Sequence, residues 1–314
     1  MNREGYVFHS YGDEKYVWHA LTAIHTIRRY DVTRPVALIA SESHLAEAAK
    51  HASELKITIM DRLADEHSSI VGFKHHIHQY LPFDRNLFLD SDMICCRNPD
   101  RLWKTLSGYE FTITGNLRAD HFFGAAKDFG VLADIFLNRR RRTMGRFGIR
   151  YLPRIQSGMI YAASAEQTER VCREAQAMLA RKHETHFQSR LYERGRALES
   201  CEWSFAIAMA RLGIPLLPWM NGYESPQMDY IASWVEHDAD FQNVQCRYYT
   251  DPQVHRLCGV QNESLQHLLL NLHTIWPGKS DVMSVCPYWL HFGWMHQKKP
   301  FYEFSEKLWH RKPS

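Results

Sequence analysis

The sequence lacks the features that mark secreted, membrane-spanning and disulfide-stabilised proteins. No apolar run approaches the ~20 residues that a membrane-spanning helix needs. The N-terminus passes almost directly into Tyr6-Val7-Phe8, without the basic and apolar stretches of a signal peptide. The 7 cysteines are odd in number and none forms a CxxC pair, so we expect reduced thiols. These absences predict a cytoplasmic protein, and we expect any contact with a membrane to be peripheral, at its inner face.

A strong excess of one charge, internal repeats and low-complexity segments are also missing. The formal net charge of +3 is too small to indicate a polyanionic partner. The chain has 314 residues, of which 45% are hydrophobic and 23% charged, an ordinary globular balance. This length is enough for one large α/β domain or two small ones.

Apolar segments of strand length alternate with segments of helical periodicity along roughly the first third of the chain. The strands are predicted at 6–10, 35–40, 57–60 and 86–89, and the helices at 14–30, 43–55 and 72–80. Near-continuous apolar strands predict an α/β fold with a parallel sheet covered by helices on both faces. Ligands bind such sheets outside the carboxyl ends of the strands. Ser10 and Tyr11, which follow the first predicted strand, are expected at that edge.

Two aspartates follow the fourth predicted strand directly, in Leu87-Phe88-Leu89-Asp90-Ser91-Asp92. Two carboxylates at this spacing suit Mg²⁺ or Mn²⁺ shared with a diphosphate. The alternative is a pair that caps the next turn. The spacing alone does not decide, because Asp238-Ala239-Asp240 repeats it with no apolar strand before it. The position at a strand end favours the metal role for the first pair.

The second half of the chain is less regular. Strands are predicted at 111–114, 155–161 and 216–219, and helices at 168–182 and 202–212. The four arginines Arg139 to Arg142 are interpreted as a solvated helix end or loop, with a phosphate or nucleic-acid contact as the less favoured alternative. His75-His76-x-His78 is too closely spaced to place three imidazoles round one ion on a regular helix, so a solvated helix face is preferred to a zinc site.

Several short motifs occur in a fixed order between about residues 5 and 302. They are the opening strand and helix at 8–30, Lys74, Leu81-Pro82-Phe83-Asp84-Arg85-Asn86 before the Asp-x-Asp pair, Asn98-Pro99-Asp100 with Leu102-Trp103, Gln156-Ser157-Gly158-Met159, and His291-Phe292-Gly293 with Lys299-Pro300. In this order they resemble the nucleotide-sugar glycosyltransferases of the GT-A fold. They are most similar to family 8, the glycogenin and lipopolysaccharide galactosyltransferase group. Position 156 is Gln where that group carries Asn, and the interval from His291 to Lys299 is two residues longer.

The resemblance implies one GT-A (Rossmann-like) domain over 1–314, with a mixed, mainly parallel sheet and helices on both faces. Residues 1–115 would form the nucleotide-sugar-binding half that contains the Asp-x-Asp strand, and 116–314 the acceptor-binding half and closing segment. The implied activity is metal-dependent transfer of a hexose from a nucleotide sugar, in the first instance a UDP-sugar, to an acceptor, with retention of configuration. The implied cofactor is Mn²⁺ or Mg²⁺.

The resemblance also assigns site residues. Asp92 and His291 would ligate the metal, with Asp90 on the metal or the ribose. Ser10 and Tyr11 would meet the nucleobase, and Lys74 would contact the donor sugar or phosphate. Lys298 or Lys299 would lie on the diphosphate as a point charge. Ser91 and Gly293 would be further donor contacts. Gln156 would contact the sugar. Glu202 would be a general base in an inverting enzyme, or would bind the sugar or stabilise positive charge in a retaining one. The alternatives are a structural amide at Gln156, a helix-start acid at Glu202, a satisfied histidine at the end of an apolar segment for His291, and a solvated surface pair for Lys298 and Lys299.

Two other functions compete with this reading. If the chain were a nucleotidyltransferase, we would expect a Gly-rich, basic loop after the first strand. The segment there, Ser10-Tyr11-Gly12-Asp13-Glu14, is acidic and has a single glycine, which counts against this function. A non-catalytic carbohydrate- or nucleic-acid-binding protein on the same fold is supported by the arginine run. For the acceptor, a bacterial surface glycan, a protein side chain and a modified nucleobase are the alternatives. Candidate aromatic platforms for an acceptor sugar, each with core packing as its commoner role, are Trp203, Trp219, Tyr223 and Trp234.

Overall fold

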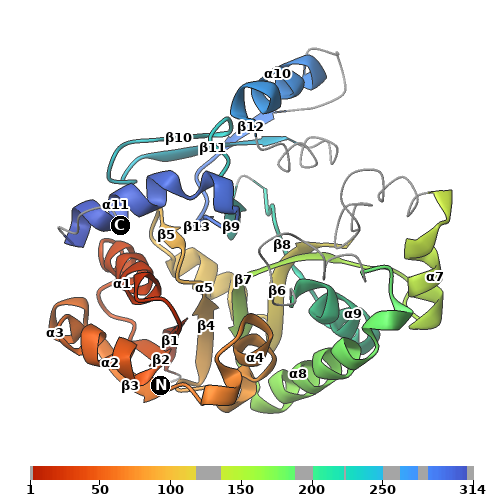
Figure 1. Ribbon diagram of the computed structural model, residues 1–314, viewed down its shortest axis with the longest axis horizontal. Coiled ribbons are helices and arrows are strands. Elements are labelled where there is room, and N and C mark those ends of the chain that lie inside the picture. Colours follow the sequence, from red (N-terminus) through yellow and green to blue (C-terminus); the bar gives the residue numbers. More distant parts are fainter. Residues whose placement is uncertain are drawn as a thin grey trace.

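A computed structural model describes residues 3–117, 136–187, 201–222, 224–249, 262–274 and 282–309. At its centre is a seven-stranded sheet with the strand order β3-β2-β1-β4-β7-β6-β8 (Figure 1). Its strands are β1 (Glu4–Ser10), β2 (Val36–Ala40), β3 (Ile57–Arg62), β4 (Arg85–Leu89), β6 (Phe111–Asn116), β7 (Arg154–Ala162) and β8 (Leu217–Pro218). Neighbours from β3 to β4 are parallel, β7 is antiparallel to both its neighbours, and β6 is parallel to β8. The sheet is therefore mixed and mainly parallel, as predicted.

Helices cover both faces of this sheet. They are α1 (Lys15–Arg28), α2 (Glu42–Ala49), α3 (Ala52–Leu55), α4 (Ile70–His75), α5 (Asp100–Leu106), α7 (Arg139–Arg146), α8 (Ala165–Ala180) and α9 (Glu202–Leu212). Because successive side chains of a strand point to opposite faces, β1 contributes to two cores. Tyr6 and Phe8 pack in the cluster that holds α1, α3 and α5 residues. Val7 packs in the cluster that holds residues of α4, α8 and α9.

A small second sheet positions the candidate site. It has the order β5-β13-β9, with β5 at Met93–Cys95, β9 at Gln227–Asp229 and β13 at Trp289–His291. β13 runs antiparallel to β5, which places His291 opposite Met93. It runs parallel to β9, which places His291 beside Asp229. Three short strands from distant parts of the chain thus meet where the central sheet ends.

The C-terminal part closes the molecule. A third sheet has the order β10-β11-β12, with β10 at Val235–His237, β11 at Val244–Tyr249 and β12 at Val282–Val285. Helix α10 (Glu263–Thr274) lies away from the central sheet, and helix α11 (Lys299–Trp309) lies against α1 (Figure 1). The Oγ1 of Thr22 on α1 is 2.8 Å from the Oγ of Ser305 on α11. This contact fixes the last described helix to the first.

Two predictions of local structure need correction. The helix predicted over 43–55 is divided into α2 and α3, and Ser41 rather than Ser43 precedes it. The histidine-rich helix is shorter than predicted, and the solvated face was wrong for His75, which is buried. Its Nε2 lies 2.8 Å from the Oγ of Ser204, and its ring stacks on Phe205, because α9 packs across this turn.

The described residues bear on two further features, membrane-spanning helices and cysteine pairing. No helix in the described ranges is long and apolar enough to cross a membrane. Six of the cysteines fall within those ranges, and all six are free thiols.

Candidate active site

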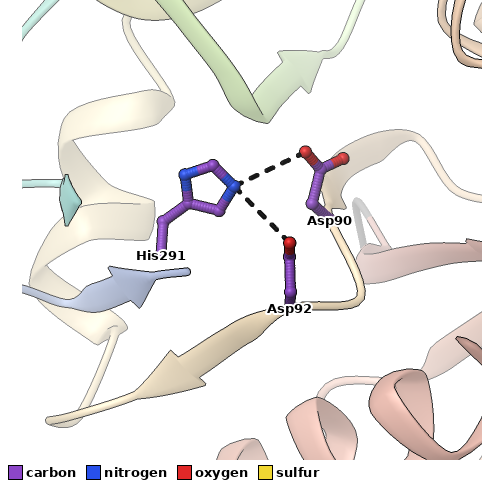
Figure 2. A group of neighbouring side chains, drawn as sticks. All are labelled: Asp90, Asp92 and His291. Carbon is purple, nitrogen blue, oxygen red and sulfur yellow. Dashed lines mark ion pairs between the residues drawn. The ribbon is translucent and has the colours of Figure 1, made fainter. Parts of the chain in front are cut away.

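Three potential metal ligands converge at the carboxyl end of β4. Asp90 follows this strand, Asp92 precedes β5, and His291 ends β13. One ligand atom from each lies within 4.8 Å of the others. The Nε2 of His291 is 3.5 Å from Asp92 Oδ1 and 3.8 Å from Asp90 Oδ2. Figure 2 shows the imidazole turned toward both carboxylates, with the two contacts as dashed lines. Backbone pairing holds them there, since Phe292 N donates to Asp92 O at 2.9 Å.

The imidazole of His291 is held on its other nitrogen. Nδ1 lies 2.8 Å from Asp229 Oδ1, and the same oxygen accepts from Gln156 Nε2 at 3.0 Å. Burial alone would lower the pKa of His291, but the charges and hydrogen bonds of Asp92 and Asp229 together outweigh burial and raise the pKa to about 10. The ring is therefore oriented from behind, and Nε2 faces the aspartates.

Two glycines make room for this ring. A Cβ on Gly158 would lie 3.2 Å from ring atoms Cδ2 and Nε2 of His291. A Cβ on Gly293 would lie only 2.6 Å from Cε1. The structure therefore places Gly293 against His291, at a contact that no other residue allows without movement.

Each aspartate is paired with a buried lysine. Lys74 Nζ lies 2.8 Å from the Asp90 carboxylate and donates to Ser157 O at 2.9 Å. Lys298 Nζ donates to Asp92 Oδ2 at 2.6 Å. Burial alone would lower the pKa of both lysines, but negative neighbours, first among them Asp90 for Lys74 and Asp92 for Lys298, outweigh burial and raise the pKa of both lysines above the usual value. Burial alone would raise the pKa of Asp92, but the charges and hydrogen bonds of Lys298 and His291 outweigh burial and hold this pKa well below its usual range.

Lys298 and Lys299 have different environments although they are adjacent. Lys299 begins α11, its side chain is 83% exposed, and its Nζ lies 3.7 Å from Glu303. The structure brings Lys298 to the aspartates and does not bring Lys299 there.

The residues predicted after β1 lie at the same sheet edge. Ser10 is buried, with its Oγ 2.8 Å from His44 Nδ1. Tyr11 is half-buried, and burial raises its pKa to about 12. The charges of Lys74 and Asp90 both act on this phenol, so its ring lies near the cluster. Ser91 is half-buried between the two aspartates.

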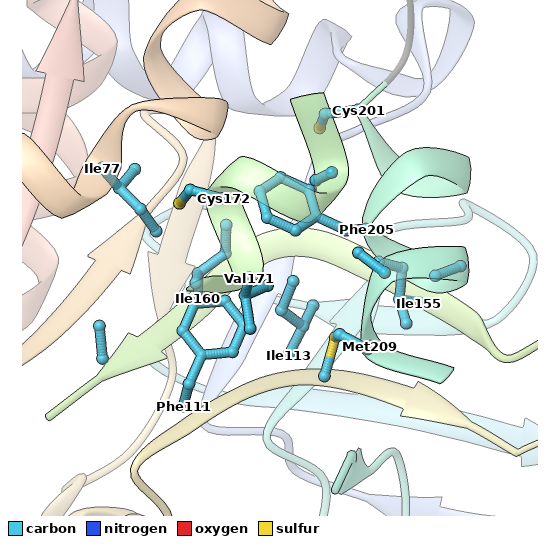
Figure 3. Packing of buried hydrophobic residues seen from close by; sticks show 14 of the residues in the cluster. Ile77, Phe111, Ile113, Ile155, Ile160, Val171, Cys172, Cys201, Phe205 and Met209 are labelled. Carbon is cyan, nitrogen blue, oxygen red and sulfur yellow. The ribbon is translucent and has the colours of Figure 1, made fainter. Parts of the chain in front are cut away.

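Glu202 is the first residue of α9 and is half-buried. Its charge is one of those that raise the pKa of Lys74, so it lies near the cluster. Cys201, just before it, is labelled in Figure 3 at the edge of the packed core, and its Sγ is 3.2 Å from Ser157 Oγ. Burial raises the pKa of this thiol. The start of α9 is thus anchored to the bulged strand that carries Gly158.

The candidate acceptor platforms differ in exposure. Trp203 and Trp234 are buried, as packing residues are. Trp219 is half-buried, and the guanidinium of Arg154 lies 5.0 Å from its ring centre. Tyr223 lies outside the described residues.

Two other sequence features also have a defined place. The arginine run begins helix α7, where Arg141 and Arg142 are exposed. The second Asp-x-Asp pair caps a turn, because Asp238 accepts from the backbone N–H groups of Gln242 and Asn243 at 2.8 and 2.9 Å.

Asp229 is the site residue that sequence reasoning missed. It ends β9, a strand of three residues in an irregular region, and no Asp-containing motif marks it. Only its pairing with β13 brings it to His291. That pairing has no local signal in the sequence.

The donor set is chemically suited to one divalent cation. Two carboxylates and one imidazole are ligands that Mn²⁺ accepts, and carboxylate oxygens also suit Mg²⁺. The two lysines add positive charge beside the carboxylates, where an anionic ligand of the cation would lie. The arrangement can therefore hold a cation together with a phosphate-bearing molecule.

No protein-family model matches this chain, and no curated protein matches its sequence. Among solved structures, the galactosyltransferase LgtC, in complex with donor and acceptor sugar analogs, superposes with a TM-score of 0.54 at 11% identity, over 99% of this chain and 97% of that one. The apo-form glycosyltransferase GlyE of Streptococcus pneumoniae TIGR4 superposes with a TM-score of 0.51 at 12% identity, over 97% of this chain and 60% of that one. At such identities the likeness concerns the fold, and this chain has the GT-A fold of those glycosyltransferases, as the sequence motifs predicted.

Proposed function

We propose that this chain is a metal-dependent glycosyltransferase that moves a hexose from a nucleotide sugar, in the first instance a UDP-sugar, to an acceptor hydroxyl. The observation that carries the proposal is the convergence of Asp90, Asp92 and His291 at the end of β4. The GT-A fold supports it, because LgtC has been crystallised with donor and acceptor sugar analogs. The three side chains would hold Mn²⁺ or Mg²⁺, and the imidazole favours Mn²⁺.

The leaving group of this reaction is a nucleoside diphosphate. When bound, the cation would neutralise the charge that develops on the diphosphate as the glycosidic C–O bond breaks. Lys298 would act on the same diphosphate as a buried point charge, because its Nζ already lies at Asp92. Lys74 would fix the Asp90 carboxylate and contribute charge toward the donor. The exposed Lys299 is a weaker candidate for this role.

The remaining donor contacts follow from position. Ser10 and Tyr11 lie at the edge where the nucleoside would bind, and Ser91 lies between the two aspartates. Gly293 would act by admitting the His291 ring rather than by touching the donor, since a Cβ there would collide with that ring. In this arrangement residues 1–115 supply most of the donor site, and 116–314 supply His291, Lys298 and the acceptor side.

Glu202 is proposed as the acid that faces the sugar. For a retaining reaction it would bind the sugar or stabilise developing positive charge, and a conventional general base would not be needed. Its place at the start of α9, near Lys74, supports a position close to the donor. Gln156 has both ends of its amide engaged, with Nε2 on Asp229 and Oε1 accepting from Gly158 N at 3.3 Å. This supports the structural alternative for that residue.

The test is calorimetric titration of UDP and GDP, with and without Mn²⁺, on the wild-type chain and on Asp92→Ala. We expect UDP to bind in the presence of Mn²⁺ and to lose that dependence in the variant. Asp238→Ala is the matched control, because Asp238 belongs to a turn-capping Asp-x-Asp pair. Nucleotide binding that is absent, or that is unchanged in Asp92→Ala, would refute the proposal. A hydrolysis screen across nucleotide sugars then identifies the donor.

A further inference from the structure

We infer that Asp229 is a positioning residue for the metal site: it orients His291 so that Nε2 faces the cation, and Gln156 in turn orients Asp229. This inference deepens the proposed function and rests on it. Asp229 has no counterpart among the motifs of the sequence, and its role follows from geometry alone. It acts through His291, so it would not itself touch the metal or the donor.

The backbone sets the distance between the two residues. β9 and β13 are parallel neighbours in a register that pairs Asp229 with His291. Just beyond that pair, Tyr230 N donates to His291 O at 2.7 Å. The side chains of paired residues in adjacent strands leave the same face of a sheet. The 2.8 Å contact between Asp229 Oδ1 and His291 Nδ1 is therefore a consequence of register.

This contact decides which ring nitrogen is available to a metal. A carboxylate can only accept a hydrogen bond, so Nδ1 must carry a proton. With Nδ1 protonated, the lone pair of the coordinating imidazole lies on Nε2. Nε2 is the atom that lies 3.5 Å from Asp92 and 3.8 Å from Asp90. The carboxylate behind the ring thus selects both the rotation and the tautomer of the ligand.

Gln156 holds the carboxylate in turn. Its Nε2 donates to Asp229 Oδ1 at 3.0 Å, while its own backbone carbonyl accepts from Gln227 Nε2 at 2.8 Å. These bonds connect β7 of the central sheet with β9 of the small sheet. The Asp229 carboxylate is consequently held by side chains from both sheets. Asp229 is not one of the three potential metal ligands, which are Asp90, Asp92 and His291.

A purely structural role for Asp229 is the competing explanation, so the readout must report on the metal itself. The first measurement is Mn²⁺ binding, followed by electron paramagnetic resonance of the free ion, on the wild type, Asp229→Ala, Asp229→Asn and Gln156→Ala. We expect Asp229→Ala to raise the Kd for Mn²⁺ about 10- to 100-fold. Asp229→Asn should lose less, because an amide oxygen can still accept from Nδ1. Asp238→Ala should bind Mn²⁺ as the wild type does.

The second measurement is proton NMR of the Co²⁺-loaded protein, which detects the exchangeable Nδ1–H of a histidine bound through Nε2. We expect this signal in the wild type and in Asp229→Asn, and its loss through fast exchange in Asp229→Ala. Should Asp229→Ala not fold, Asp229→Asn and Gln156→Ala decide by their Mn²⁺ affinities.

Two failures can be told apart. Wild-type affinity in all three positioning variants, together with loss of binding in Asp92→Ala, would overturn this inference and leave the metal site standing. A wild-type chain that binds no Mn²⁺, with or without UDP, would overturn the proposed function as well.

Discussion

Replacing Gly293 by alanine should damage the metal site without touching any ligand. A Cβ at this position would lie 2.6 Å from His291 Cε1 and 3.1 Å from Nδ1. Ordinary van der Waals contact of a Cβ begins near 3.4 Å, so ring and strand must separate by about 0.8 Å. The ring cannot simply swing away, because Nδ1 is bonded to Asp229 and Gly158 lies close to the ring as well.

The size of the effect follows from this displacement. Metal–ligand distances tolerate changes of only about 0.2 Å, and the shift needed here is several times larger. We therefore expect Gly293→Ala to raise the Kd for Mn²⁺ about 10- to 100-fold, or ~1.4 to 2.8 kcal/mol. Overpacking of a buried site should also lower the free energy of unfolding by about 1 to 3 kcal/mol. Gly158→Ala should be milder, since its Cβ would meet the ring at 3.2 Å.

The assay is Mn²⁺ titration beside a denaturant unfolding curve for each variant. Gly145→Ala is the matched control, because a Cβ at this position of α7 would meet nothing within 4 Å. It should leave Mn²⁺ affinity unchanged and stabilise the chain by about 0.5 to 1 kcal/mol, as alanine does in a helix. If Gly293→Ala binds Mn²⁺ with wild-type affinity, the His291 ring does not occupy the place described above.

Two further predictions concern a buried carboxylate and the adjacent lysines. Burial alone would raise the pKa of Asp31, but hydrogen bonds, first among them those from Arg34, hold this pKa well below the usual range. The stability that the Asp31 carboxylate supplies is therefore present above the unfolded pKa of about 3.9 and is lost as the pH falls below that value toward the folded pKa. Asp31→Asn should therefore cost about 2 kcal/mol near neutral pH and flatten the acid side of the stability curve in urea melts, and an unchanged slope would count against this. Lys298→Met should weaken UDP binding in the presence of Mn²⁺ about 10-fold without weakening Mn²⁺ binding alone, because Lys298 competes with a cation for Asp92. Lys299→Met is the control for Lys298→Met in the same titration. A loss of UDP affinity in Lys299→Met alone would contradict the assignment of Lys298 to the diphosphate.

The parts of the fold that could be predicted are those with a strong local signal. The strand before Asp90 is continuously apolar and ends in charge, and β4 ends at Leu89. Helix α9 has the bounds predicted for it, Glu202–Leu212, because its apolar residues are bounded by Gly213 in the left-handed conformation. In both cases the residues of the element and those next to it in the sequence are enough to predict where it ends.

The parts that could not be predicted depend on pairing between distant segments. β5, β9 and β13 have three residues each, too few to show a period. Their register nevertheless decides that His291 meets Asp92 and that Asp229 meets His291. His291 could be predicted because it lies in a segment that resembles a family motif. Asp229 lies in no such motif, so the sequence does not mark it as a site residue.

Adjacent residues can also differ in ways that spacing does not reveal. Lys298 and Lys299 were equal candidates for the diphosphate. Lys298 precedes the first turn of α11 and points to Asp92, while Lys299 opens that helix on its solvent side. The point at which the helix begins therefore separates the two lysines: Lys298 lies in the preceding turn, where its side chain reaches Asp92, and Lys299 lies in the helix.

The two Asp-x-Asp pairs of this chain show what converts a spacing into a site. Both place carboxylates two residues apart, and both come directly after a strand, β4 for Asp90 and β10 for Asp238. Asp238 turns its oxygens to the backbone N–H groups of its own loop, which satisfies them locally. Asp90 and Asp92 instead have as partners the side chains of Lys74, Lys298 and His291, drawn from three other segments. A carboxylate whose bonds are made by its own loop has little left for a cation. One held only by side chains keeps lone pairs that face a shared space, and it is this difference in partners, not the spacing, that makes the first pair a candidate metal site.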